Sequence, residues 1–262
     1  MGVQTAITLQ EAQKLFKDFK LKNLQKTTNG VIDTTYLLNN YVLKRYEREI
    51  DSKIQRDKAL LRVLYESGLN VPLHIASSKE WHLYSRLKGS VPKTTCYFHI
   101  QALARFLASL HTLTCKQHQK KLFLEAYDIT KMLNFTKQNY YGYYKKLQSL
   151  SSFTQRKDGF IHGDIFKDNT LFEGEKLGVF DFIDGGVGSF SFDIAVTLMA
   201  FNPSKRHALT RLFLNTYNQK APKKVSPQEL QKEMKNAAKL YGLLRIDKYK
   251  NTQKAKELAN FW

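Results

Sequence analysis

One stretch of ten residues, "FIHGDIFKDN" at positions 160–169, limits the possible folds and chemistries of this chain more than any other. Directly after an apolar pair it places His162, Asp164 and Asn169 in the order H-x-D-x4-N. Any one of these short polar residues alone is an ordinary turn former. The ordered set, followed by a further aspartate at position 181, indicates instead that several polar side chains converge on one site.

A β-hairpin is predicted directly after this stretch. "NTLF" and "LGVFDF" have the character of strands, with a turn at residues 173–175 between them. Because the side chains of a strand alternate between its two faces, we expect Asp181 to point away from Phe180 and Phe182 and to lie among apolar neighbours. A carboxylate in such surroundings is costly unless a cation meets it. The pattern therefore predicts a cationic partner for Asp181.

Asp164, Asn169 and Asp181 offer only oxygen atoms as ligands. Carboxylate and amide oxygens are what Mg²⁺ takes when it keeps several waters and also binds phosphate oxygens. If the loop and the hairpin bring these three side chains together, the sequence predicts a site for Mg²⁺ and a phosphate compound.

The periodicity of the apolar residues changes partway along the chain. Its first part has short strand-like runs, a helical pattern over residues 51–68, and an opening helix whose Thr8 and Glu11 form a capping box. Long helical patterns follow, "DITKMLNFTKQNYYGYYKKLQSL" among them, with the hairpin as an island. We expect an α+β protein with a small β-rich N-lobe, residues 1–87, a larger helical C-lobe, residues 88–262, and a cleft between them.

The formal net charge is +19, as in many nucleic-acid-binding proteins. The lysines, however, are spread along the chain with acids between them, which favours a solvated surface and leads us to expect no nucleic-acid partner. A positive field also attracts a nucleoside triphosphate. No apolar run approaches the roughly 20 residues that span a bilayer. The two cysteines, Cys96 and Cys115, fit neither a disulfide framework nor a zinc site, so we expect a cytoplasmic protein without a membrane partner.

H-x-D-x4-N followed by a strand with "FDF" resembles the catalytic and metal loops of the protein-kinase-like fold, in the branch that includes aminoglycoside and choline kinases. "FDFIDGGVGSFSFDIAVTL" resembles the same branch, with Asp193 beginning a helix twelve residues after Asp181. Within it, "IHGDIFKDNTLFEGEKLGVFDF" and "NGVIDTTYLL" most resemble homoserine kinases, although Asp33 stands where Asn is common. The resemblance implies a bilobal protein-kinase-like fold over nearly the whole chain, with ATP and Mg²⁺ as cofactors.

The resemblance also implies roles for the loop residues. Asp164 would accept the proton of the attacking hydroxyl or orient that hydroxyl. Asn169 and Asp181 would hold Mg²⁺ against the phosphate oxygens. His162 and Asp193 would support the loop structurally rather than react.

The N-lobe is expected to bind the nucleotide. Lys44 would grip the α- and β-phosphates, and Asp57 on the following helix would orient it, with Glu49 as the alternative partner. A loop over the phosphates and a hinge whose backbone contacts adenine would complete the site. The residues expected to bind nucleotide are Asn29, Gly30, Thr34, Lys44, Asp57, Ser85 and Leu87.

The helical lobe after Asp193 is expected to hold the acceptor. Its few acids argue against a polycationic aminoglycoside. A quaternary ammonium would want an aromatic cage, for which the tyrosines at 140, 141, 143 and 144 are candidates, although clustered tyrosines are more often packing residues. Arg245 suits bidentate recognition of a carboxylate, with an ordinary surface arginine as the alternative.

The leading hypothesis is an ATP-dependent phosphotransferase with an alcohol acceptor, a kinase for the side-chain hydroxyl of L-homoserine in threonine biosynthesis. A kinase for another small alcohol, such as choline or an aminoglycoside, is the alternative in the same class. A catalytically silent, basic nucleic-acid-binding relative is the alternative in another class. Salt-dependent binding to random oligonucleotides without ATP binding would indicate that alternative.

Overall fold

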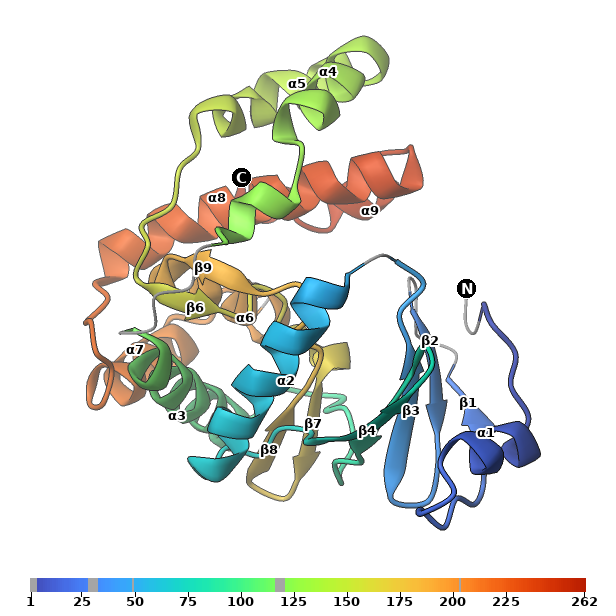
Figure 1. Cartoon of the computed structure of the whole chain (residues 1–262). Helices are drawn as coiled ribbons and strands as arrows, with labels where there is room; N and C mark the ends of the chain where they lie inside the picture. Colours follow the sequence, from blue (N-terminus) through green and yellow to red (C-terminus); the bar gives the residue numbers. More distant parts are fainter. Residues whose placement is uncertain (1–3, 28–32, 49, 116–120, 203) are drawn as a thin grey trace. The chain divides into compact units, whose positions relative to one another are not determined.

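The structure is a computed structural model and describes residues 4–27, 33–48, 50–115, 121–202 and 204–262 (Figure 1). The chain forms two compact units. The first contains residues 1–92 and 168–183, and the second contains residues 93–167 and 184–262. The chain therefore passes between the units three times, whereas the change of periodicity suggested a single boundary after residue 87.

The first unit is built on a five-stranded antiparallel sheet with the strand order β1-β2-β3-β5-β4 (Figure 1). Its strands are β1 (Gln25–Lys26), β2 (Thr34–Leu37), β3 (Tyr41–Arg45), β4 (His74–Ser78) and β5 (Trp81–Ser85). β2 and β3 pair antiparallel and form a hairpin around Asn39 and Asn40. The core under the sheet consists of Ala12, Phe16, Leu21, Tyr36, Leu38, Leu43, Trp81 and Leu83.

Two helices and a second hairpin complete the first unit: α1 (Leu9–Leu15), α2 (Asp51–Glu66), β7 (Thr170–Glu173) and β8 (Lys176–Val179). α1 begins at the predicted capping box, in which Thr8 and Glu11 each accept the other's backbone N–H. The hairpin joins this unit through Asn70. The Asn70 amide donates to the carbonyl of Leu177, and the Val179 N–H donates to the carbonyl of Asn70 at 3.1 Å.

The second unit is mainly helical. Its longer helices are α3 (Tyr97–Thr114), α4 (Ile129–Asn139), α5 (Tyr141–Leu147), α6 (Phe190–Phe201), α7 (His207–Asn218) and α8 (Pro227–Tyr249), and it also contains α9 (Gln253–Lys256), β6 (Gly159–Ile161) and β9 (Gly186–Gly188). α6 packs against α8 and α3, and α3 packs against α7. α6 is buried along nearly its whole length, as expected of a helix that is apolar on all sides. Its first turn therefore carries Asp193 into the interior.

The structure differs from the predicted elements in two places. The helix expected over residues 128–150 is divided at Tyr140, where the backbone leaves the helical conformation with φ −143° and ψ 55°. The Tyr140 hydroxyl instead donates to the carbonyl of Lys250. The antiparallel pair β6–β9 was not predicted, because strands of three residues with several glycines show no alternating pattern.

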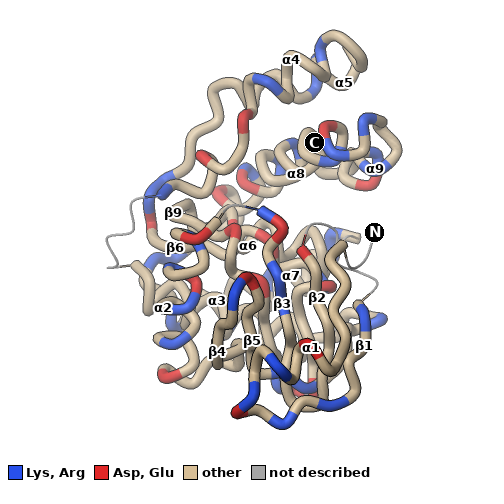
Figure 2. The backbone as a smooth tube through the Cα atoms, turned by 45° about the vertical axis from the view of Figure 1, so that its right-hand side comes forward, with Lys and Arg blue, Asp and Glu red and all other residues tan. Residues whose placement is uncertain are grey.

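Lys and Arg residues lie on strands, helices and loops of both units rather than on one element (Figure 2). This distribution agrees with the expected solvated surface. In the ranges that the structure describes, no helix has the length and apolarity needed to cross a membrane.

Candidate active site

The first unit brings Lys44 and Asp181 together from positions 137 residues apart. Lys44 lies on β3, and its Nζ is 2.7 Å from Oδ1 of Asp181 and 3.9 Å from Oδ2 of Asp33. The same Nζ also lies over the ring of Tyr46, 4.8 Å from the ring centroid. Burial alone would lower the pKa of Lys44, but the two carboxylates raise it above its ordinary value, so the ammonium keeps its charge.

The structure has the predicted cationic partner of Asp181, which is Lys44, but the prediction that Asp181 lies among apolar neighbours was wrong. β8 ends at Val179, so Asp181 lies beyond the strand, and its side chain is 39% exposed. Its φ of +67° turns the backbone out of the extended conformation, which removes the alternation on which the prediction rested. Phe182 is buried, as expected.

Asn169 and Asp181 lie at the same end of the β7–β8 hairpin. Asn169 ends a short 3₁₀ turn before β7, and its carbonyl accepts the N–H of Phe180 at 3.2 Å. Their oxygen donors fit a hard cation such as Mg²⁺. The described residues contain no group of three His, Cys, Asp or Glu side chains suited to a metal, so water and phosphate oxygens would have to complete its ligand shell.

Two further residues of the first unit that are predicted to bind the nucleotide, Thr34 and Asp57, are both buried. The Thr34 hydroxyl is buried; it accepts the N–H groups of Gln4 and Thr5 and donates to Glu47. Asp57 is buried on α2. The pKa of Tyr46, whose ring contacts Lys44, is raised first by the burial of Tyr46 itself and then by the charge of Asp57. The orientation of Lys44 by Asp57 stays a prediction, and Asn29, Gly30 and Glu49 lie outside the described residues.

The adenine contact expected from the backbone of Ser85 stays a prediction, and the structure shows that the Ser85 N–H is already bonded. That N–H donates to the carbonyl of Leu73 at 2.8 Å, because the pairing of β5 with the β4 segment continues to this point. The Ser85 hydroxyl accepts the Leu73 N–H, also at 2.8 Å. Leu87 follows the end of β5 and stays a predicted contact.

The second unit holds the loop that contains His162 and Asp164. The carboxylate of Asp193 accepts the backbone N–H of His162 at 2.9 Å and that of Gly163 at 2.7 Å. Nδ1 of His162 accepts the N–H of Asp164 at 3.2 Å. His162 and Asp193 thus have the geometry of structural supports for the loop, while Asp164 is half-buried at its end.

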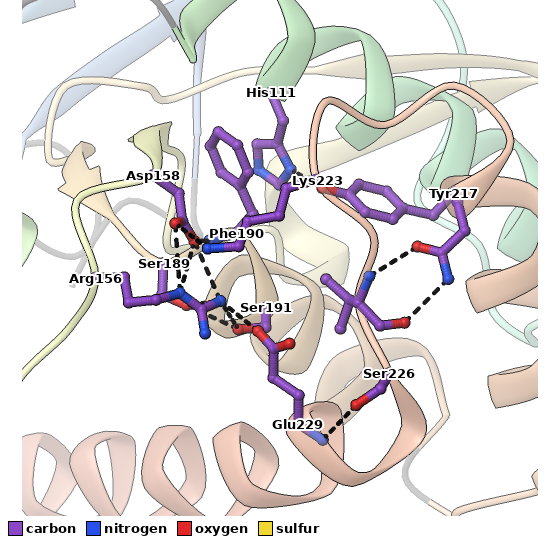
Figure 3. Close-up of polar contacts among 12 residues, drawn as sticks. His111, Arg156, Asp158, Ser189, Phe190, Ser191, Tyr217, Lys223, Ser226 and Glu229 are labelled. Atoms are coloured by element: carbon purple, nitrogen blue, oxygen red, sulfur yellow. Dashed lines mark hydrogen bonds and ion pairs between the residues drawn. The ribbon is translucent and has the colours of Figure 1, made fainter.

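His111 and Tyr217 belong to the same support and were missed in the sequence. Nε2 of His111 lies 3.2 Å from Asp193, and its Nδ1 lies 2.8 Å from the Tyr217 hydroxyl. The imidazole stacks on Phe190, with ring centroids 4.1 Å apart (Figure 3). The one available signal was a histidine inside the apolar pattern "LASLHTL", which more often marks an ordinary packed histidine.

An ion-pair cluster adjoins this support, since Asp158 of the cluster accepts the backbone N–H of Phe190 at 3.2 Å. Arg156 contacts Asp158, Ser191 and Glu229, and Lys223 reaches Asp158 at 2.8 Å (Figure 3). Burial alone would raise the pKa of Asp158, but the hydrogen bonds from Lys223 and Arg156 lower it. The cluster ties the start of β6 to the first turns of α6 and α8.

Arg245, the predicted carboxylate contact of the acceptor, is engaged within the protein. Its Nη1 is 2.8 Å from Glu257 and 3.0 Å from the carbonyl of Lys254. A pocket of about 410 Å³ elsewhere in this unit is lined by Thr94, Thr95, Lys167, Phe201, Asn202, Ser204 and Arg206. Among the described residues, this lining includes two cations and no carboxylate.

Comparison with known proteins agrees with this arrangement. Residues 23–227 match the phosphotransferase enzyme family (APH). Homoserine kinase of Polaromonas naphthalenivorans (strain CJ2) is 25% identical over 228 residues, which cover 76% of this chain and 72% of that protein. Solved phosphotransferase and kinase structures share the protein-kinase-like fold of this chain. The gentamicin complex of APH(2″)-IIa has a TM-score of 0.64 at 20% identity, over 98% of this chain and 95% of that one. Amicoumacin kinase hAmiN, in complex with AMP-PNP and Ca²⁺, has a TM-score of 0.69 at 18% identity, over 96% and 91%.

The family match covers well over half of the chain and includes β2, β3, the loop with Asp164 and the hairpin with Asp181. The chain therefore belongs to the phosphotransferase enzyme family and is an enzyme that transfers a phosphoryl group to a hydroxyl acceptor.

Proposed function

We propose that this protein is an ATP- and Mg²⁺-dependent kinase of the cytoplasm that phosphorylates the side-chain hydroxyl of L-homoserine for threonine biosynthesis. The observation that carries the proposal is the 2.7 Å ion pair between Lys44 and Asp181. Phosphoryl transfer needs positioning and charge neutralisation more than covalent chemistry, and it uses a lysine for the phosphates and an acid for the metal. The first unit provides both groups, Lys44 and Asp181, and they are in contact with each other.

The first unit would bind the nucleotide. Lys44 would hold the α- and β-phosphates, and Asp33 and Tyr46 would keep its ammonium in place when Asp181 turns to the metal. Asn169 and Asp181 would hold Mg²⁺, which when bound neutralises charge on the phosphate oxygens. Thr34 would support the site indirectly, since its hydroxyl is already bonded to Gln4 and Glu47.

Asp164 would accept the proton of the acceptor hydroxyl or orient that hydroxyl for attack. Its place in the loop is fixed by the hydrogen bonds of the two preceding residues to Asp193. Such a fixed geometry is what a positioned base requires, because a misplacement of about 1 Å can cost about 100-fold in rate.

The charges of the second unit support an acceptor with a carboxylate over a polycationic one. Of the four acids after residue 202, three are in ion pairs: Glu229 with Arg156, Asp247 with Lys250, and Glu257 with Arg245. A polyamine would have to break these pairs or remain unpaired. The basic pocket that contains Lys167 and Arg206 favours an anionic group as well.

The aromatic cage considered for a quaternary ammonium is occupied by the protein's own lysines. Nζ of Lys145 lies 5.0 Å from the ring centroid of Tyr141, and Nζ of Lys137 lies 5.6 Å from that of Tyr144. A choline headgroup would meet like charges at these rings. The relative named homoserine kinase supports the amino-acid acceptor, whereas the antibiotic complexes show that this fold also serves larger alcohols.

Release of ADP with a panel of acceptors tests the proposal. We expect turnover with homoserine well above that with serine, threonine, choline or kanamycin, and loss of turnover when EDTA removes divalent cations. Asp164→Ala should lower kcat by about 100-fold or more. Asp18→Ala, the same change at an exposed aspartate of the first unit, is the matched control and should leave kcat unchanged.

Preference for another alcohol would replace homoserine with that acceptor and keep the kinase assignment. No ADP release with any acceptor in the presence of Mg²⁺ would refute the proposed function.

A further inference from the structure

Tyr241 of α8 reaches the loop that carries Asp164. Its hydroxyl donates to the carbonyl of Gly163, the residue directly before Asp164. Its ring lies edge-to-face against Phe166, with centroids 5.3 Å apart and the planes at 62°. Phe166 is two residues after Asp164, and its N–H donates to the Asp164 carbonyl at 2.8 Å. Tyr241 therefore contacts the chain on both sides of Asp164.

The Gly163 backbone is fixed at both of its polar groups. Its N–H donates to Asp193 at 2.7 Å, and its carbonyl accepts from Tyr241. Its φ is +73°, and a Cβ atom at this position would lie 2.1 Å from the ring of Phe123. With the N–H and the carbonyl both held, the peptide that leads into Asp164 has little freedom to rotate.

We propose that Tyr241 is a positioning residue for Asp164, acting through the carbonyl of Gly163. Asp193 holds the loop from the side of α6, and Tyr241 holds it from the side of α8. Without the phenol, the Gly163 carbonyl loses its buried donor and the peptide between Gly163 and Asp164 can tilt. Asp164 would then lie away from the position at which it meets the acceptor hydroxyl.

Two other roles for Tyr241 fit the surroundings less well. Burial raises the pKa of Tyr241 well above its ordinary value, and the nearby Tyr127 and Asp164 add to this shift, so the phenol stays neutral and donates rather than acting as a base. A purely apolar packing role would be served equally by phenylalanine. It would give no reason for a hydroxyl on the carbonyl of this loop.

The inference rests on the proposed role of Asp164, and Tyr241→Phe tests it. This variant keeps the ring and removes the donor. We expect kcat to fall about 10- to 100-fold, because a misplaced base loses alignment rather than binding. The KM for ATP and the affinity for a non-hydrolysable ATP analogue should stay within about two-fold of the wild type.

Tyr140→Phe is the matched control. It also removes a tyrosine hydroxyl that donates to a backbone carbonyl, in this case that of Lys250 just after α8. It leaves the loop untouched, so kcat should not change. Phe166→Leu is a second variant. It keeps the Tyr241 hydroxyl but removes the ring contact, so we expect a smaller loss in the same parameter.

Hydrogen exchange measured by mass spectrometry separates this inference from the proposed function. Amides of residues 162–166 should exchange faster in Tyr241→Phe and not in Tyr140→Phe, whatever the acceptor is. Unchanged exchange in this segment overturns the inference, as does a kcat within two-fold of the wild type while Asp164→Ala is inactive. Equal loss of nucleotide binding and kcat in a folded Tyr241→Phe protein also overturns it, because that result indicates general packing. If Asp164→Ala keeps full activity, the role proposed for Asp164 fails instead, and faster exchange alone would then show only that Tyr241 fixes the loop.

Discussion

At the scale of single residues, two backbone conformations bear on the candidate site. Gly163 and Asp181 both have positive φ, +73° and +67°. Glycine adopts this conformation freely, and aspartate is among the few other residues that tolerate it. At Asp181 the cost is of order 1 kcal/mol. The conformation turns the chain at the end of β8, where the carboxylate meets Lys44 instead of continuing the strand.

Gly163 should tolerate no side chain. Gly163→Ala combines a positive φ with a clash against Phe123, so we expect it to lower the free energy of unfolding by about 2–5 kcal/mol. Gly174→Ala is the control, because Gly174 has φ +60° in the β7–β8 turn with no atom near the added Cβ. It should cost only about 1 kcal/mol. Urea unfolding of both variants measures the difference, and equal losses would contradict the steric argument.

The sequence singled out Asp164, Asn169, Asp181 and Lys44 as candidate site residues. The structure places Lys44 against Asp181, while the roles of all four stay predictions. The sequence could not show that Asp181 is exposed or that the Ser85 N–H is already bonded, since both depend on where a strand ends and what pairs with it. Tyr241 was missed for the same kind of reason. Its partner, Gly163, is 78 residues away, and the sequence of its helix carries no motif that marks this tyrosine.

At the scale of elements, α8 connects the loop that carries Asp164 to an ion pair in another part of the same unit. Its first turn is capped by Ser226 and tied to Arg156 through Glu229. Further along α8, Tyr241 contacts the loop that carries Asp164. Arg245 follows one turn later, on the same side of the helix as Tyr241. If Arg245 does bind the acceptor, one rigid helix would both recognise the substrate and hold the loop with Asp164.

Glu233 of α8 is a site where neutralisation should stabilise the protein. Burial raises the pKa of its carboxyl above the ordinary value, and its Oε2 is buried with no hydrogen-bond partner among the described residues. The charged form is thus disfavoured in the folded state, so folding loses stability as the pH rises from the unfolded-state pKa through the raised one. Glu233→Gln should raise the free energy of unfolding by some tenths of a kcal/mol, up to about 1, at pH 7.5.

The gain from Glu233→Gln should disappear near pH 4, where the carboxyl is protonated in both states. Denaturant unfolding at the two pH values measures it. If Glu233→Gln stabilises the protein more at pH 4 than at pH 7.5, the pKa of Glu233 is shifted down rather than up in the folded protein.

The elements themselves were largely predictable. The capping box of α1, the β2–β3 and β7–β8 hairpins, α2 and the start of α8 at Pro227 all carry local signals, and the structure has each of them. The division between α4 and α5 has no such signal. At Tyr140 a contact with Lys250 from a distant helix accompanies the break, which local propensity does not encode. The β6–β9 pair is too short for any periodic pattern to appear.

At the scale of the whole molecule, the net charge of +19 is the feature with the broadest effect. It should speed the arrival of an anionic nucleotide and should be weakened by salt, because the Debye length falls from about 10 Å at 0.1 M to about 3 Å at 1 M. We expect the KM for ATP to rise several-fold between 0.05 and 0.5 M NaCl (roughly a three-fold fall in that length) with kcat unchanged.

The acceptor provides the internal control for the salt series. Homoserine is a zwitterion without net charge at pH 7, so its KM should change little over the same range. If both KM values rise together, salt acts on the protein's conformation and not on the attraction of the nucleotide.

The threefold passage of the chain between its two compact units limits how such enzymes can be recombined. A single crossover near residue 92 between this chain and a relative would join a foreign hairpin to the native sheet, and Lys44 would face an aspartate from another parent. Exchange of a complete unit needs two inserted segments with junctions at 92/93, 167/168 and 183/184. Chimeras with all three junctions take Asn70 and its hairpin partners, Leu177 and Val179, from the same parent. Chimeras with a single junction near residue 92 take Asn70 from one parent and the hairpin from the other.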